Sequence, residues 1–213
     1  MRRLGARDRI LEAAERLFAE RGLAAVSLNE INNAARQRNT AAVHYHFKSK
    51  PGLLDAVLAP HLEAIDTERR ARLDALELDG DASLTSLVGV LVEPLAERLD
   101  SDSGRAFLQI QAQIPPHERP AMPAARRLAA LVGRGLGQGF PAEIAVLRGD
   151  SAQLLLFPAL AERARREATD RAAREDRALF VENLIDVLLG VLTAPASAAT
   201  RARAMDVHHD ASA

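Results

Sequence analysis

Hydrophobic residues recur every three to four positions along most of the chain, which is the spacing of amphipathic helices. The segment 6 to 21 carries the first such face, formed by Ile10, Ala14, Leu17 and Phe18. Gly22 directly follows it and is placed to end the helix in a left-handed conformation. The pattern therefore predicts a first helix over 6 to 21.

Two shorter helices are predicted next. Ser27 and Glu30 have the spacing of a capping box, so a second helix is expected to begin there. After a polar break, Asn39 can cap a third helix in which Val43 and Phe47, four residues apart, pack inward. The outward faces of this third helix then carry Thr40, Ala41, His44 and Tyr45.

From residue 51 onward the same periodicity predicts long helices, at 51 to 76, 84 to 99, 103 to 114, 121 to 138, 141 to 168 and 172 to 193. Turn-forming residues separate them, and no strand pattern competes. The predicted fold class is therefore all-α, with a three-helix domain over 1 to 50 and a helical bundle over 51 to 194. The remainder, 195 to 213, is small and polar, and we expect it to be disordered.

Three prolines fall inside the predicted long helices: Pro60, Pro94 and Pro158. A proline within a helix removes one backbone hydrogen bond and bends the helix. Alternatively, each proline ends a helix and divides the segment in two. The sequence leaves both interpretations open.

Composition limits the class of protein. The chain has 213 residues, 48% of them hydrophobic, which is enough for a substantial core. It contains no cysteine, which excludes disulfides and thiolate metal sites. The basic start is not followed by an apolar run of signal-peptide length, and the apolar stretch from 184 to 192 is too short to cross a bilayer. We expect a soluble, cytoplasmic protein.

Charge is distributed unevenly although the whole chain has a net charge of only −1. Residues 1 to 52 carry ten Lys and Arg against five Asp and Glu, a net charge of +5, and the remainder has a net charge of −6. A basic N-terminal domain on an acidic body indicates that one end of the protein binds a polyanion.

The segment from 36 to 50 holds the only tyrosine and the only two lysines of the chain. Its cations, amides and hydroxyls are the groups that contact nucleic acid, and a short helix followed by a helix with a polar face is typical of a helix-turn-helix. Lys48 and Lys50 can neutralise phosphates, and the helix N-terminus at 49 to 52 can bind the same anion. The alternative is a solvated, charged surface.

Other chemistry finds little support. His44 and His46 are two apart, so on a helix their imidazoles diverge and cannot bind one metal ion. The four alternate glycines from 133 to 139 lack a preceding strand, so we interpret them as a loop and not as a dinucleotide site. There is no nucleophile elbow and no phosphate loop. We therefore predict no enzymatic activity, no metal and no cofactor.

At its N-terminus the chain resembles the TetR family of bacterial transcriptional regulators. The resemblance is carried by the motifs Ile10-Leu11-Glu12-Ala13-Ala14-Glu15-Arg16-Leu17-Phe18-Ala19-Glu20-Arg21-Gly22, Ser27-Leu28-x-x-Ile31 and Val43-His44-Tyr45-His46-Phe47-Lys48-Ser49-Lys50-x-x-Leu53-Leu54. Arg36 stands where the family usually has a glycine, and His44 stands where it usually has a tyrosine that grips phosphate.

The resemblance implies roles for individual residues. Ser27 is implied to contact phosphate, while Thr40, Ala41 and Tyr45 would face the bases and His44 and Lys50 would hold the backbone. Gln37 and Arg38 could read a purine by paired hydrogen bonds. The complete predicted DNA-binding set is Ser27, Gln37, Arg38, Asn39, Thr40, Ala41, His44, Tyr45, His46, Lys48 and Lys50.

The resemblance also implies a ligand-binding and dimerisation domain, a palindromic DNA operator and a small-molecule effector, with no membrane partner. The expected function is that of a ligand-responsive repressor of transcription. The predicted ligand site comprises Leu91, Phe107, Gln111 and Phe157. The predicted homodimer interface comprises Phe180, Leu184, Val187, Leu188 and Val191, because the last helix is apolar over more than one face. The alternative is a buried central helix in a monomer.

Overall fold

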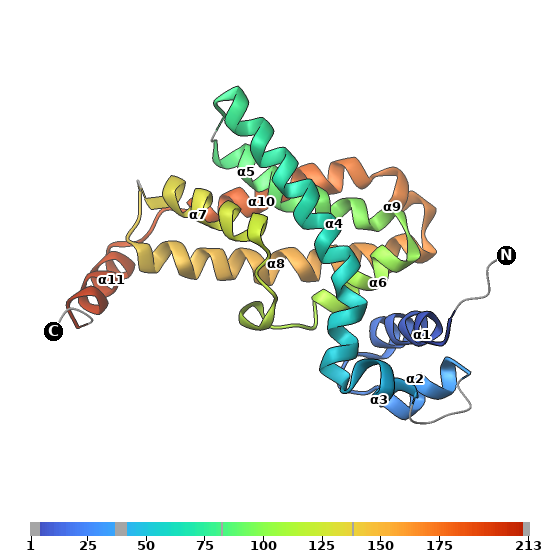
Figure 1. The fold of residues 1–213 in the computed structure, drawn as a ribbon. Helices are drawn as coiled ribbons and strands as arrows, with labels where there is room; N and C mark the ends of the chain where they lie inside the picture. Colours follow the sequence, from blue (N-terminus) through green and yellow to red (C-terminus); the bar gives the residue numbers. More distant parts are fainter. Residues whose placement is uncertain (1–4, 37–41, 82, 138, 211–213) are drawn as a thin grey trace.

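The computed structural model describes residues 5–36, 42–81, 83–137 and 139–210 (Figure 1). Every regular element in these ranges is helical, which confirms the all-α class. The longer elements are α1 (Ala6–Arg21), α4 (Lys50–Asp79), α5 (Leu84–Ala96), α6 (Asp102–Gln111), α7 (Pro123–Gly137), α8 (Ala142–Thr169), α10 (Arg177–Thr193) and α11 (Ala198–Asp210). The short ones are α2 (Leu28–Ala34), α3 (Ala42–Phe47), α9 (Arg171–Glu175) and two 3₁₀ turns, η1 (Glu97–Asp100) and η2 (Pro116–Glu118).

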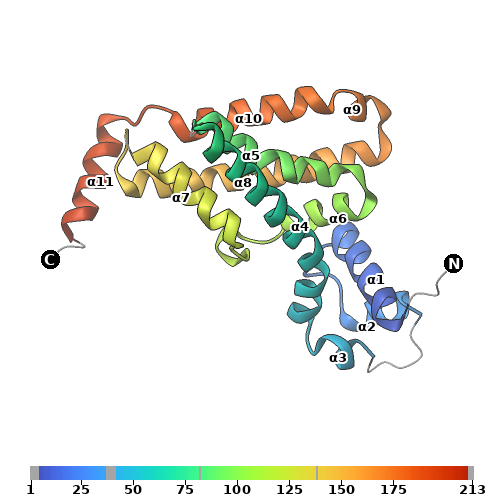
Figure 2. The same ribbon diagram turned by 45° about the horizontal axis from the view of Figure 1, so that its top comes forward.

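The first three helices form a small domain at one end of the molecule (Figures 1 and 2). Their shared interior is made by Ile10, Phe18, Ile31, Val43 and Phe47. The predicted helix end at Gly22 is confirmed in part, and the predicted capping box of Ser27 and Glu30 is confirmed in full. Gly22 has φ +90°, although its ψ of 150° lies outside the left-handed helical region, and Ser27 with Glu30 forms the capping box.

Helix α4 connects this domain to the body. The hydroxyl of Ser49 accepts a hydrogen bond from the Gly52 amide at 3.1 Å, which caps the helix start. A Cβ at Gly52 would lie 2.5 Å from the carbonyl oxygen of Phe47, so only glycine allows α3 to approach α4 this closely. The expected boundary between 50 and 51 thus falls in the first turn of α4.

The body is a bundle arranged around α8. Helices α6 and α10 pack on α8, α5 packs on α10, and α7 crosses α4 and α5 (Figures 1 and 2). By length and composition alone, α8 is the one unbroken described helix that could cross a membrane. In the structure, α6, α7 and α10 pack on α8, and 28% of its apolar window is buried.

All three prolines lie inside helices. Pro60 is within α4, Pro94 within α5 and Pro158 within α8. The interpretation in which each proline ends a helix is therefore wrong. Packing on neighbouring helices stabilises each segment enough to retain the helix without the missing hydrogen bond.

Two segments expected to be irregular are helical. The glycine run begins inside α7, where Gly135 faces Leu84 so closely that a Cβ would lie 2.8 Å from a Leu84 methyl. Gly135 is therefore explained by the close contact with Leu84, which leaves no room for a side chain, and not by a loop. The tail expected to be disordered contains α11, because Ala196 and Ala204 are buried with Ile144 in a small apolar cluster.

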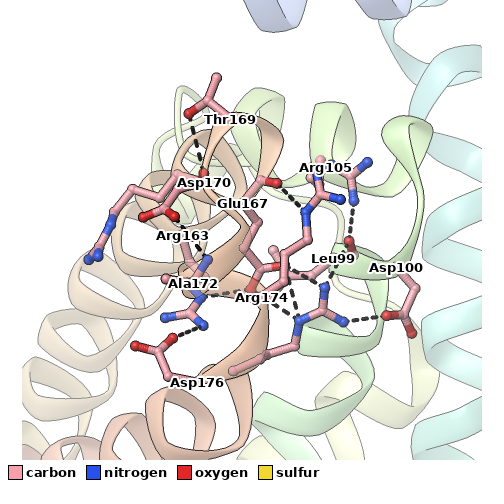
Figure 3. A network of polar contacts seen from close by, with 12 residues as sticks. Leu99, Asp100, Arg105, Arg163, Glu167, Thr169, Asp170, Ala172, Arg174 and Asp176 are labelled. Carbon is pink, nitrogen blue, oxygen red and sulfur yellow. Dashed lines mark hydrogen bonds and ion pairs between the residues drawn. The ribbon is translucent and has the colours of Figure 1, made fainter.

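A buried ionic network joins three elements at the end of the body nearest α6 (Figure 3). The Glu167 carboxylate, fully buried on α8, accepts hydrogen bonds from Arg163 at 2.7 Å and from Arg177 of α10. Arg177 also pairs with Asp100 of η1, and Arg163 pairs with Asp176 at 2.5 Å. Burial raises the pKa of Glu167, but the hydrogen bonds from the two arginines outweigh it, so the pKa lies below its ordinary value.

Glu167→Ala should lower the free energy of unfolding by about 3–5 kcal/mol, because it leaves two guanidinium groups without their shared acceptor. Since the native pKa of Glu167 is depressed, its contribution is present above the ordinary glutamate pKa and is lost as the pH falls through the native value. Urea unfolding at several pH values measures both effects. Glu162→Ala is the matched control, because its pair with Arg165 is exposed on the same helix. Equal stability of the two variants would contradict the prediction.

Candidate nucleic-acid interface

Helix α3 separates an inner from an outer face, as its spacing predicts. Val43 and Phe47 are 1% and 6% exposed and pack into the small domain. His44, Tyr45 and His46 are exposed, Tyr45 by 84%. Tyr45 is the most exposed aromatic side chain in the described part of the chain, and a phenol held in water on a rigid helix is available to a partner.

The two lysines follow α3 as expected. Lys48 ends the helix with φ +63°, its amide donating to the His44 carbonyl at 3.0 Å. The His44 ring Nδ1 lies 3.1 Å from the Lys48 carbonyl oxygen, which fixes the imidazole beside this turn. Lys50 lays its ammonium 5.9 Å from the centre of the Phe18 ring. Its stem is thus packed on the domain while the charge remains near α3.

In this structure, which contains no DNA, Ser27 caps the N-terminus of α2. Its hydroxyl donates to Glu30 Oε2 at 2.8 Å and accepts from the Glu30 amide at 3.2 Å. Hydrogen bonds from the Ser27 amide, then its hydroxyl, then Arg21 lower the pKa of Glu30 to about 2. A phosphate contact by Ser27 stays a prediction, and it would compete with Glu30 for the hydroxyl proton.

Five residues of the predicted DNA-binding set lie outside the described residues: Gln37, Arg38, Asn39, Thr40 and Ala41. Their roles remain predictions. The described part of the predicted DNA-binding surface is therefore α3, which we call the reading helix, together with Lys48 and Lys50 after it and Ser27 before α2.

Sequence reasoning missed the polar contacts that fix the small domain to the body. Gln113, directly after α6, accepts a hydrogen bond from the Leu23 amide at 2.7 Å and donates to the Phe18 carbonyl at 3.1 Å, both at the end of α1. No local pattern marks this glutamine, because its partners are about 90 residues away.

A second contact joins α1, α4 and α6. Glu15 accepts a hydrogen bond from Ser103 at 2.7 Å, and His61 Nε2 lies 3.3 Å from Glu15 and 3.1 Å from Ser103. The His61 ring also stacks on Phe107 at 4.8 Å. Through these groups, α6 contacts the small domain and the predicted ligand site at once.

The predicted ligand residues are divided by burial. Phe107 and Gln111 are each 1% exposed, and the Gln111 amide Nε2 is buried with no hydrogen-bond acceptor among the described residues. Leu91 and Phe157 are half-buried. A hollow of about 220 Å³ lies elsewhere, between α4, α5 and α7, lined by Leu73, Leu76, Glu77, Gly80, Asp81, Leu87 and Leu131. None of the four predicted residues lines it.

The predicted dimer residues also divide. Leu184 and Leu188 are 4% and 0% exposed and belong to the core of a single chain, so they are not available to a partner. The sequence could not distinguish the two faces of this apolar helix. Val187 is 41% exposed and remains available, while Phe180 and Val191 are half-buried.

The described geometry is that of a small three-helix domain carried on an all-helical body. Residues 10–57, which span α1 to the first part of α4, match the family described as "Bacterial regulatory proteins, tetR family". Over this segment, which is less than a quarter of its length, the chain is similar to the TetR family.

Individual proteins are also similar to parts of the chain or to its fold. The chain is 34% identical over 91 residues to the HTH-type transcriptional repressor KstR2 of Rhodococcus jostii (strain RHA1), a match that covers 43% of this chain and 44% of that protein. Among solved structures, it is similar to NalD, the secondary repressor of the MexAB-OprM multidrug efflux pump in Pseudomonas aeruginosa. That similarity has 21% identity and a TM-score of 0.51, covering 85% of this chain and 94% of NalD, and it indicates a shared fold.

Substitutions on the two faces of α3 should have unequal effects on the free energy of unfolding. Phe47→Ala should lower the free energy of unfolding by about 3–5 kcal/mol, because a buried phenyl ring leaves a cavity. Tyr45→Ala should change it by less than about 0.5 kcal/mol, since the ring contacts mainly water. Chemical unfolding of both variants checks this. A large loss of stability in Tyr45→Ala would mean that the ring supports the fold.

Proposed function

We propose that this protein is a ligand-responsive transcriptional repressor that binds a palindromic DNA operator as a homodimer and is released by a small, largely apolar effector. The observation that carries the proposal is the match over 10–57, which falls on the helices that expose Tyr45 and its neighbours. As a soluble regulator of transcription it acts in the cytoplasm, and its activity requires no cofactor.

Specific DNA reading is supported by the surface of α3 and its flanks. A rigid helix presents His44, Tyr45 and His46 outward, and Lys48 with Lys50 follows where the phosphates of a bound duplex would run. One short helix can read only a few base pairs. A second copy, reading a half-site roughly 34 Å away, supplies the rest of the specificity.

Dimerisation is supported by apolar side chains that one chain leaves in water. On α8, Val146, Leu147 and Leu154 are 59–65% exposed, and on α10, which packs beside α8, Leu179 and Val187 are also exposed. Leu147 and Leu154 are seven residues apart and share one face. A second copy covering this surface would remove these groups from water.

Effector release is supported by the position of α6. Helix α6 contributes Phe107 and Gln111 to the interior and is bound to α1 through Ser103 and Gln113. A ligand that displaces α6 would therefore move the small domain, and with it the reading helix. Such a change in the separation of the two reading helices lowers operator affinity.

Genomic DNA fragments selected by the full-length protein should converge on one palindrome, bound at least about a thousandfold more tightly than scrambled DNA at moderate salt. Tyr45→Ala should weaken this binding by about tenfold to a hundredfold, since a base contact is worth roughly 1–3 kcal/mol. Fluorescence anisotropy measures both. His117→Ala, an exposed substitution on the body, is the control. Equal binding to all sequences would refute an operator-reading function.

Leu154→Glu should raise the dimer dissociation constant by about tenfold or more, because a carboxylate would be buried in an apolar interface. Leu78→Glu is the matched control, since Leu78 is 88% exposed on α4, away from α8 and α10. Sedimentation velocity over a concentration series distinguishes monomer from dimer. If both variants stay dimeric, the interface lies elsewhere.

A further inference from the structure

Among the described residues, two that are not glycine have a positive φ, and both are cations of the small domain. Arg36 has φ +51° directly after α2, and Lys48 has φ +63° directly after α3. They therefore bracket the segment that contains the reading helix. Lys48 already belongs to the predicted DNA-binding set, whereas Arg36 does not.

A positive φ is unfavourable for arginine, because its Cβ crowds the following carbonyl oxygen. Glycine, or less often asparagine, is the usual residue one position beyond the end of a helix. Here the helix ends with the Arg36 amide donating to the Asn33 carbonyl at 3.0 Å, a bond that glycine would make equally well. The backbone thus gives no reason for an arginine at this position.

The side chain gives no internal reason either. Arg36 is exposed, and its guanidinium makes no hydrogen bond or ion pair with any other described residue. A cation near the C-terminus of α2 does interact favourably with the helix dipole. A basic residue one or two positions earlier would give the same effect without strain, so the dipole does not explain this site.

Arg36 is not isolated on the surface. It lines a hollow of about 320 Å³ between α1 and the end of α2, together with Arg9, Glu12, Ala13, Arg16, Ala34 and Ala35. Three arginines and one glutamate are therefore among the residues that line one concave surface. The ion pair of Arg16 with Glu20 is 3.8 Å long and more than half exposed, so it holds Arg16 only weakly. The net positive charge of this hollow is suited to an anion.

Strain that persists at one residue is a reason to look for a function of its side chain. We propose that Arg36, supported by Arg9 and Arg16, binds a backbone phosphate of the operator outside the major groove, at the end of the reading segment opposite Lys48. This inference rests on the proposed DNA-binding function. A phosphate bound here would position the reading helix without adding base specificity.

The test compares Arg36→Gly, Arg36→Lys and the wild-type protein on the selected operator, by anisotropy across a salt series. Loss of one phosphate contact should reduce the slope of log K against log salt by about one in Arg36→Gly, with affinity several-fold weaker at low salt. Arg36→Lys should keep most of the slope. Arg165→Gln, which removes an exposed arginine from the body, should leave the slope unchanged and controls for overall charge.

Thermal unfolding separates binding from folding. Glycine relieves the strained backbone, so the unfolding midpoint of Arg36→Gly should be equal to or higher than that of the wild type. A lower midpoint would mean that Arg36 supports the fold, and it would overturn the proposal. An unchanged salt slope in Arg36→Gly would overturn it as well.

The same titrations distinguish this proposal from the proposed function. If the wild type does not prefer any operator over scrambled DNA, the regulator assignment fails. If the wild type binds its operator specifically and Arg36→Gly binds it equally well at every salt concentration, only the phosphate site fails.

Discussion

The contact between α1 and α6 holds the small domain in a fixed position on the body, and the rest of the arrangement depends on it. Gln113 accepts a hydrogen bond from the Leu23 amide and donates one to the Phe18 carbonyl, while Ser103 and His61 contact Glu15 on the same helix α1. The apolar core is also continuous across this junction. The small domain is therefore fixed to the body by hydrogen bonds and by apolar contacts.

The reading surface follows from burial on the opposite side of α3. A helix of six residues would not be stable alone. Val43 and Phe47 fix it to α1 and α4, and that attachment holds His44 and Tyr45 in water. Lys48 and Gly52 complete the arrangement, since the sharp turn between α3 and α4 depends on one strained backbone and one missing Cβ.

The body shows a different balance of apolar burial. Its last helix is apolar on several faces, yet Leu184 and Leu188 stabilise one chain while Val187 and the exposed leucines of α8 remain available to another. The Glu167 network closes the same bundle at the end nearest α6 (Figure 3). The ion pairs of this network fix one end of the core. The exposed apolar side chains of α8 and α10 form a surface suited to a second copy.

The sequence by itself determined most of the helices, because helical periodicity and the Ser27 capping box are local signals. It also placed Val43 and Phe47 inside and Tyr45 outside, since spacing on one helix fixes relative directions. Only the tertiary structure decided which apolar face of α10 meets its own core, why Gly135 faces Leu84, and that the tail forms α11. Gln113 and the strained φ of Arg36 belong to the same group. Each depends on groups distant in sequence or on a backbone angle that neighbouring residues do not specify, so no local pattern could encode them.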